Sequence, residues 1–139
     1  MADGLVMNVD TRRMQQIINS LPGAANDLLA GVATEMVSDI KLSMVNSPAT
    51  GITYRRRSVE HTSSSPGNPP RPDTGELMGS ITHRQTGDLE QTIHDQVEYG
   101  VYQELGTEFI EARPFMSPVF DQWRVGGFAD FVRSYPLVT

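Results

Sequence analysis

The chain has 139 residues, of which 38% are hydrophobic, and its formal net charge is −6 at pH 7. This length suits one domain with its own core, whereas the negative charge argues against a free duplex-DNA-binding domain, which usually carries a basic face. The absence of cysteine excludes disulfides and thiolate metal sites. The N-terminus lacks the pattern of a signal peptide, and no apolar stretch reaches the length of a membrane span.

The N-terminal part of the chain is predicted to be helical. Apolar residues at helical spacing predict a short helix over residues 11–20, which ends before Pro22 because proline disfavours helical geometry in the preceding residue. Pro22 suits the first turn of a second, longer helix, and the breakers within residues 46–51 end that helix. The apolar stripe that predicts it consists of Leu29, Val32, Ala33, Met36, Val37, Ile40 and Met44.

The segment over about residues 47–73 is unlike the rest of the chain. Its consecutive arginines, serines and prolines do not form a packed core by themselves, and long irregular segments within a compact domain are often functional. We predict an extended arm with a loose hairpin around Tyr54 and Val59, followed by a proline-rich turn. Its candidate contacts with a neighbouring subunit or another partner are Tyr54, Arg55, Arg56, Arg57, Pro66, Pro69 and Pro70.

Two strands are predicted to follow the arm. They cover residues 76–85 and 89–99 and are joined by a hairpin turn at residues 86–88. The first of these strands is weakly patterned, and a helical turn at residues 75–79 is an alternative for its opening. The strands are expected to pair antiparallel, as hairpin strands do.

Helical signals return after the second strand. Residues 99–105 predict one or two helical turns that stop at Gly106. A further helix is expected to start at the Arg-Pro-Phe sequence of residues 113–115, because proline is favourable at the first helical position. The glycine pair at residues 126–127 is expected to break it. The C-terminal tail, over about residues 126–139, carries a last apolar face that either joins the core or packs on a neighbouring subunit.

These elements predict a single α+β domain over residues 1–139. A long N-terminal amphipathic helix and shorter C-terminal helices are expected to pack on a small, mostly antiparallel sheet. The extended Pro/Arg-rich arm is expected to leave the body of this domain.

No residue pattern indicates catalysis. His61, His83 and His94 have no metal-binding spacing. No serine lies in a Gly-x-Ser-x-Gly elbow, and no glycine-rich loop has phosphate-binding spacing. We therefore expect no catalytic, cofactor-binding or metal site and no enzymatic activity.

Charge is distributed unevenly along the chain. The arginine run at residues 55–57 either contacts nucleic acid or an acidic partner, or is a solvated loop; an acidic neighbour in an assembly is preferred, since the chain is itself acidic. Residues 73–121 carry ten carboxylates against only Arg84 and Arg113. This acidic block either repels DNA from a channel wall or is a solvated surface.

Four short motifs in a fixed order are more specific. Residues 65–70 read Ser-Pro-Gly-Asn-Pro-Pro, and residues 73–77 read Asp-Thr-Gly-Glu-Leu, with Ser-Ile at 80–81. Residues 99–107 read Tyr-Gly-Val-Tyr-Gln-Glu-Leu-Gly-Thr, and residues 112–118 read Ala-Arg-Pro-Phe-Met-Ser-Pro. This order resembles the head–tail joining, or tail-completion, proteins of the neck of long-tailed bacteriophages. The resemblance covers about residues 20–124.

The motif residues are expected to have structural roles. They provide turns into the sheet, a helix stop at Gly106 and a helix start at residues 113–115, where Arg113 is expected to pair with Glu104 or Glu108. Gly100 departs from the alanine that is common in the family, which is expected to loosen a helical turn by about 1 kcal/mol. The motif residues are Thr74, Gly75, Leu77, Tyr102, Glu104, Gly106, Thr107, Arg113, Pro114 and Phe115.

The resemblance implies a structural virion protein, assembled in the host cytoplasm, that forms a closed ring in the neck. Sixfold symmetry is expected, with head-closure or portal-side proteins on one face and a tail terminator or tail tube protein on the other. DNA would pass through this ring without specific binding, and no cofactor or membrane is implied. The candidates for facing the channel are Glu104, Glu108 and Glu111.

Two other functions are compatible with the sequence. One is a tail-terminator or tail-tube protein, which shares the size and the formation of rings. The other, more remote, is a small hydrolase that uses His83 or His94, although no nucleophile–base pair is visible.

Overall fold

The computed structural model describes residues 4–12, 14 and 22–134 and has the predicted α+β class, with helices and small antiparallel sheets. The helix predicted over residues 11–20 lies almost entirely outside these described residues. In chain order, the elements are β1 (Val6–Asn8), α2 (Pro22–Val45), β2 (Thr53–Arg56), β3 (Val59–Thr62), α3 (Glu76–Ser80), β4 (Thr82–Gly87), β5 (Glu90–His94), α4 (Tyr99–Leu105), α5 (Ser117–Gln122), the π-helical turn η1 (Trp123–Gly127) and α6 (Phe128–Ser134).

An antiparallel sheet in the order β1-β5-β4 forms one layer of the molecule. On the central strand β5, Ile93 pairs with Met7 of β1 and His83 of β4, and its side chain is fully buried. Both predicted strands are shorter than expected. The first opens with helix α3, which was the alternative, and β5 stops at His94, ahead of Glu98 at the N-cap position of helix α4.

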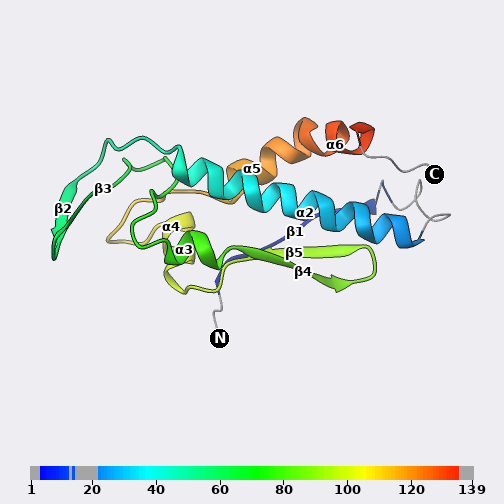
Figure 1. The fold of residues 1–139 in the computed structure, drawn as a ribbon, viewed down its shortest axis with the longest axis horizontal. Coiled ribbons are helices and arrows are strands. Elements are labelled where there is room, and N and C mark those ends of the chain that lie inside the picture. The colour runs from blue at the N-terminus through cyan, green and yellow to red at the C-terminus, as the bar shows by residue number, and fades with distance from the viewer. Residues whose placement is uncertain (1–3, 13, 15–21, 135–139) are drawn as a thin grey trace.

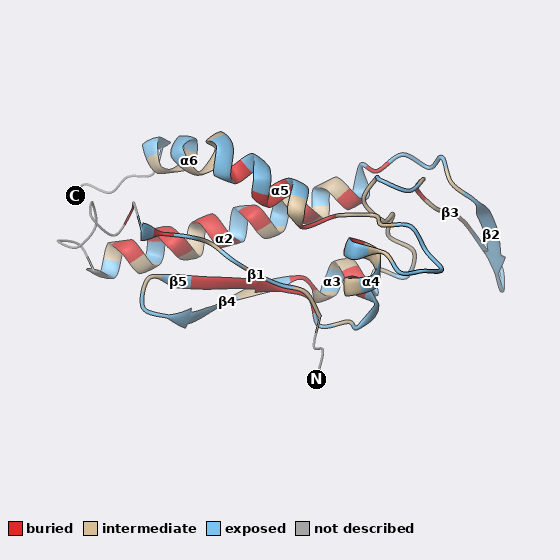
Figure 2. Ribbon diagram, turned by 180° about the vertical axis from the view of Figure 1, so that it is seen from behind, coloured by how far each residue is buried: buried red, intermediate tan, exposed pale blue. Residues whose placement is uncertain are grey.

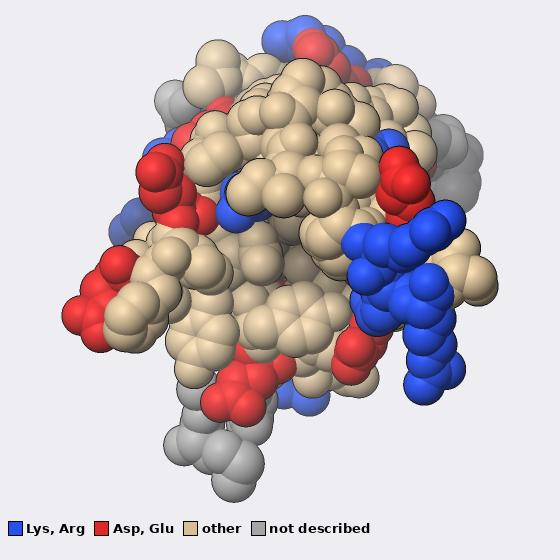
Figure 3. Space-filling view, turned by 90° about the vertical axis from the view of Figure 1, so that its left-hand side faces the viewer, with Lys and Arg blue, Asp and Glu red and all other residues tan. Residues whose placement is uncertain are grey.

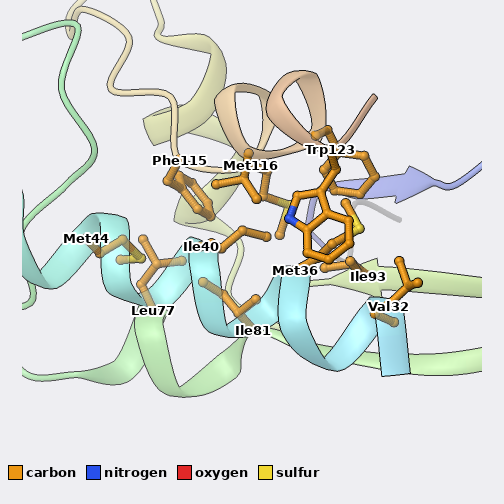
Figure 4. Close-up of a cluster of buried hydrophobic side chains, with 13 residues drawn as sticks. Val32, Met36, Ile40, Met44, Leu77, Ile81, Ile93, Phe115, Met116 and Trp123 are labelled. Carbon is orange, nitrogen blue, oxygen red and sulfur yellow. The ribbon is translucent and has the colours of Figure 1, made fainter. Parts of the chain in front are cut away.

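Helix α2 lies between this sheet and the C-terminal helices (Figure 1). Because it is covered on two sides, its apolar stripe is broad and supplies much of the core. Although α2 is long, no helix among the described residues combines the length and apolarity needed to cross a membrane. The main core (Figure 4) consists of Val32, Ala33, Met36, Ile40, Met44, Leu77, Ile81, Ile93, Phe115, Met116, Val119, Phe120 and Trp123.

The predicted start of the C-terminal helix is wrong by one turn. Helix α5 begins at Ser117, and Pro118 rather than Pro114 occupies its first turn. Both prolines satisfy the local rule for a helix start. The carboxylate of Glu104 favours the later start, because it accepts the backbone N–H groups of residues 115–117, just before Pro118.

The glycine pair at residues 126–127 does not break the helix, contrary to the prediction. It lies in the π turn η1, which leads directly into α6. The ring of Trp123 occupies space that a side chain at residue 127 would need, because a Cβ at Gly127 would lie 3.3 Å from it. Trp123 also donates its indole N–H to Asp39 over 2.9 Å and packs against Phe131. The described part of the last apolar face therefore packs on the chain's own core.

The arginine run lies in a two-stranded hairpin. Strands β2 and β3 pair from Thr53↔Thr62 to Arg56↔Val59, and Arg57 begins the turn with a φ of 56°. The hairpin projects beyond the C-terminal end of α2 (Figure 1), and most of its residues are exposed (Figure 2). The proline turn, residues 65–72, brings the chain back to the body.

Candidate functional site

The four motifs that carry the resemblance meet around one cavity. In the proline turn, Gly67 donates its N–H to the carbonyl of Ala112 over 2.9 Å. Arg113 donates its N–H to the carbonyl of Gln103 in α4 over 2.6 Å. Residues 73–77 form a further wall of the cavity, whose volume is about 440 Å³. The end of the molecule that carries the hairpin is visibly hollowed, and basic side chains gather beside the hollow (Figure 3).

Glu104 links two of these motifs. Its carboxylate accepts the backbone N–H groups of Phe115 (2.6 Å), Met116 (3.0 Å) and Ser117 (2.9 Å), together with the Ser117 hydroxyl. A carboxylate is favoured there because the N–H groups at the start of a helix have no partner within the helix. The side chain is only 5% exposed. The expectation that it faces a channel is therefore wrong.

The sequence predicted that Arg113 pairs with Glu104 or Glu108, but it pairs with neither. Its guanidinium donates instead to the carbonyl of Ser64, with its Nε and one terminal nitrogen 3.3 and 3.2 Å away. Arg71 donates in the same way to the carbonyl of Thr62 over 2.6 Å. Both arginines thus fix the chain where it leaves β3, and both line the cavity.

Only one arginine of the run at residues 55–57 turns toward the body. Successive side chains of a strand point to opposite faces, so Tyr54 and Arg56 lie on the same face of β2. Both bind Asp73: the tyrosine hydroxyl donates over 2.9 Å, and the guanidinium makes two bonds of 2.9 Å. The tyrosine bond and the guanidinium hold the pKa of Asp73 below its usual value. Arg55 and Arg57 are exposed and pair with no carboxylate among the described residues.

Two motif glycines have the conformations that their turns require. Gly75 precedes α3 with a φ of 83°, and Gly106 ends α4 with a φ of 74°, both in the left-handed region that favours glycine. Thr74 supports the first turn, because its hydroxyl accepts the N–H of Glu76 over 3.3 Å. Thr107 supports the second in the same manner. Gly106 therefore has the role of helix stop that was predicted, whereas the turn at Gly75 leads into helix α3 and not directly into the sheet.

The apolar motif residues differ in burial. Leu77 and Phe115 are buried in the main core, and Pro114 is half-buried beside it. Tyr102, by contrast, is exposed on α4. In the proline turn, the carbonyl of Pro69 accepts the hydroxyl of the buried Ser47 over 2.6 Å, which ties the turn to the end of α2.

Asp95 is a buried acid that the sequence did not single out. Its side chain is fully buried, and burial raises its pKa from 3.8 to about 6. The N–H groups of Leu5 and Val97 oppose this rise, and the charge of Glu104 adds to it. Neither carboxyl oxygen has a hydrogen bond of good geometry among the described residues. The only sequence signal was a charged residue that interrupts an apolar strand pattern.

The buried acid gives Gly100 a steric role that the sequence did not indicate. A Cβ at Gly100 would lie 2.3 Å from one carboxyl oxygen of Asp95, and a Cβ at Gly4 would lie 2.1 Å from the other. The two glycines therefore leave room for the buried carboxyl group. The space available at this position therefore favours glycine.

Gly100→Ala is accordingly expected to lower the free energy of unfolding by about 1–2 kcal/mol, because overpacking costs about 1–3 kcal/mol and outweighs the helix-propensity gain of up to about 1 kcal/mol. Gly79→Ala is the matched control, since Gly79 is also helical but has open space around it. The control is expected to be neutral or stabilising by up to about 1 kcal/mol. Urea unfolding of both variants measures the difference, and equal stabilisation by both would remove the steric role of Asp95.

The histidines occupy structural positions. The ring nitrogens of His83 lie 3.0 Å from the Thr34 hydroxyl and 2.9 Å from the side-chain oxygen of Gln91. His94 is buried, and burial lowers its pKa, with smaller contributions from nearby positive groups. His61 lies against Tyr54 in the cavity wall. Across the described ranges, no group of acidic or histidine side chains is arranged to hold a metal ion.

The turn between α4 and α5 presents apolar side chains to solvent. Phe109 is 87% exposed, and Leu105 is exposed as well. Glu108 and Glu111 flank the turn and are exposed too, in contrast to Glu104. The sequence signal for this surface is a pair of apolar residues that lies between two predicted helices and belongs to no predicted helix or strand.

Comparison of the chain with protein-family models, with curated proteins and with solved structures finds no match. Inferences about function therefore depend on the four motifs and on the geometry around the cavity.

Proposed function

We propose that the chain is a structural protein of the neck of a long-tailed phage, where it forms a closed ring that joins the head or portal side to the tail and surrounds the DNA channel. One observation carries this proposal. Three of the four motifs that resemble the neck family bind one another through Gly67, Glu104 and Arg113, and the fourth, residues 73–77, lines the same cavity. Chance matches have no reason to be brought together in this way.

The exposed surfaces suit a protein that assembles with copies of itself. Ile52, Tyr54 and Val59 on the arm are exposed, as are Leu105 at the end of α4 and Phe109 in the turn that follows. Exposed apolar groups of this kind mark interaction surfaces. A head-to-tail contact that closes on itself forms a ring, for which sixfold symmetry is proposed. Head-closure or portal-side proteins and a tail terminator or tail tube protein would meet the two faces.

The long amphipathic helix gives this subunit a rigid axis, and the Pro/Arg-rich arm reaches a neighbouring subunit or ring. Arg55 and Arg57 are free to meet an acidic neighbour. Glu108 and Glu111 are exposed, in contrast to Glu104, so they are available either to face the channel or to contact a neighbouring subunit. Carboxylates on the channel wall would repel DNA and let it pass without binding.

Immunogold labelling of virions with an antibody against this chain tests the proposal. We expect label at the head–tail junction, and images of the isolated neck are expected to show a ring around a central channel. Label along the tail tube, at the tail tip or nowhere on the virion would overturn it, and label on tails that lack heads would favour a tail terminator.

The arm is tested by replacing residues 53–62 with an Asn-Gly turn. The backbone bonds of Ser63 to Gly51 (2.8 Å) and Ile52 (3.0 Å) remain, so a two-residue turn closes the shortened hairpin. We expect a folded protein that no longer supports formation of complete virions. Normal virion yield with the shortened arm would exclude this role. Arg84→Gln, an exposed arginine of β4, is the matched control and is expected to leave the yield unchanged.

A further inference from the structure

The cavity contains two guanidinium groups that no carboxylate neutralises. Arg71 and Arg113 are half-buried and donate to backbone carbonyls, and neither has an acidic partner among the described residues. By contrast, Arg56 in the same cavity is neutralised by Asp73. Partly buried cations without a counter-charge are costly. A carboxylate that enters the cavity would relieve this cost.

Further polar atoms of the cavity wall are unsatisfied. The hydroxyl of Ser64, whose side chain is fully buried, has no hydrogen-bond partner, and neither do Nε of Arg71 and the side-chain oxygen of Gln103. Buried polar groups are normally paired. The rest of the wall is mixed. Leu77, Met78 and Tyr99 are apolar or aromatic, whereas Glu76 and the Arg56-bound Asp73 are acidic, so that the three arginines of the wall outnumber its two carboxylates. The cavity therefore suits a peptide that carries an acidic group beside an aromatic one, and its volume of about 440 Å³ falls in the range of ligand sites.

This chain itself displays such a peptide. Phe109 is 87% exposed at a tight turn, with Glu108 before it and Glu111 shortly after it. The turn is held by Thr107, whose hydroxyl accepts the N–H groups of Phe109 and Ile110 and whose own N–H donates to the carbonyl of Ile110 over 2.8 Å. A turn that is already ordered loses little conformational entropy when it binds.

We propose that the turn over residues 107–111 of one copy docks in the cavity of the next copy. Phe109 packs against the apolar wall, and the flanking carboxylates neutralise Arg71 and Arg113. The occupant is a second copy because this turn presents an exposed aromatic side chain between two carboxylates, which complements both the excess of arginine and the apolar part of the cavity wall. The contact joins two different surfaces, so it can repeat from copy to copy, as a ring requires. The inference rests on the self-assembly in the proposed function and names the contact that would produce it.

Complementation between two variants of the full chain tests this contact. Phe109→Ser removes the turn's anchor and leaves the cavity intact, whereas Arg71→Glu reverses the cavity's charge and leaves the turn intact. Each variant alone is expected to lose self-association, with a dissociation constant raised about thirtyfold or more, as for an interface hot spot. An equimolar mixture is expected to form a dimer and nothing longer, because only one functional contact remains. Analytical ultracentrifugation measures all three samples.

Arg84→Glu is the matched control, an exposed charge reversal away from the cavity that is expected to associate like the wild type. If Arg71→Glu proves unfolded by circular dichroism, Phe109→Ser carries the test by itself, since that side chain makes almost no contact within the subunit. The inference is overturned if Phe109→Ser associates as the wild type does, or if the wild type remains a monomer at every concentration. Immunogold labelling of the neck is independent of either outcome, so failure of this contact and failure of the proposed function are distinguishable.

Discussion

Replacing Glu104 with alanine is expected to lower the free energy of unfolding by about 3–5 kcal/mol, the cost of removing one partner from a buried, hydrogen-bonded charged group. Three backbone N–H groups, of Phe115, Met116 and Ser117, would lose their acceptor. They lie beside the main core, where water replaces the lost bonds poorly. The loss corresponds to a melting temperature lower by roughly 10 °C or more for a chain of this length.

Glu104→Gln separates charge from shape. The amide keeps the volume but turns an NH₂ group toward N–H donors, so we expect a loss of about 2–3 kcal/mol. Glu108→Gln is the control four residues away; its side chain is exposed, and its effect is expected to stay within about 0.5 kcal/mol. Urea unfolding followed by circular dichroism gives all three values. Equal stability of Glu104→Gln and the wild type would show that the carboxylate does not hold the helix start.

The burial of Glu104 explains why the local reading of the sequence failed at this helix. Proline at the first helical turn is a local signal, and both Pro114 and Pro118 give it. The choice between them depends on an acid from α4, more than ten residues earlier, and periodicity contains no information about such a contact. Glu104 was also a candidate for facing the channel, because composition alone does not distinguish a buried carboxylate from an exposed one.

Local signals predicted other parts of the fold well. Gly106 ends α4 because its left-handed backbone is a property of the residue itself. The glycine pair after Trp123 was misleading because glycine weakens a helix without forbidding it. The chain continues through the π turn η1, in which the indole ring of Trp123 lies against Gly127.

The candidate site was predictable only in part. The motifs at residues 73–77 and 112–118 indicated which segments line the site. The cavity itself forms because the proline turn binds Ala112 and because Arg113 binds Gln103 of α4. The arginine run was correctly placed in a hairpin, whereas the two arginines without a counter-charge, Arg71 and Arg113, are revealed by their surroundings alone.

Asp95 should make the stability of the protein depend on pH in an unusual direction. The pKa of about 6 lies above the ordinary 3.8, so the folded chain holds this proton more tightly than the unfolded chain. The contribution is fully present only below the unfolded pKa of 3.8, and it is lost as the pH rises through about 6. A shift of about two units corresponds to a loss of roughly 3 kcal/mol.

Asp95→Asn removes this titration and nearly preserves the shape that Gly4 and Gly100 enclose. The stability of the variant relative to the wild type is therefore expected to rise by roughly 3 kcal/mol between about pH 4 and pH 7.5. Asp27→Asn, at an exposed position of α2, is the control and is expected to run parallel to the wild type. Urea unfolding across this range measures the three profiles. Parallel profiles for Asp95→Asn and the wild type would mean that Asp95 stays ionised in the folded chain, held by the N–H groups of Leu5 and Val97, and the gap left by the two glycines would then serve to admit those donors.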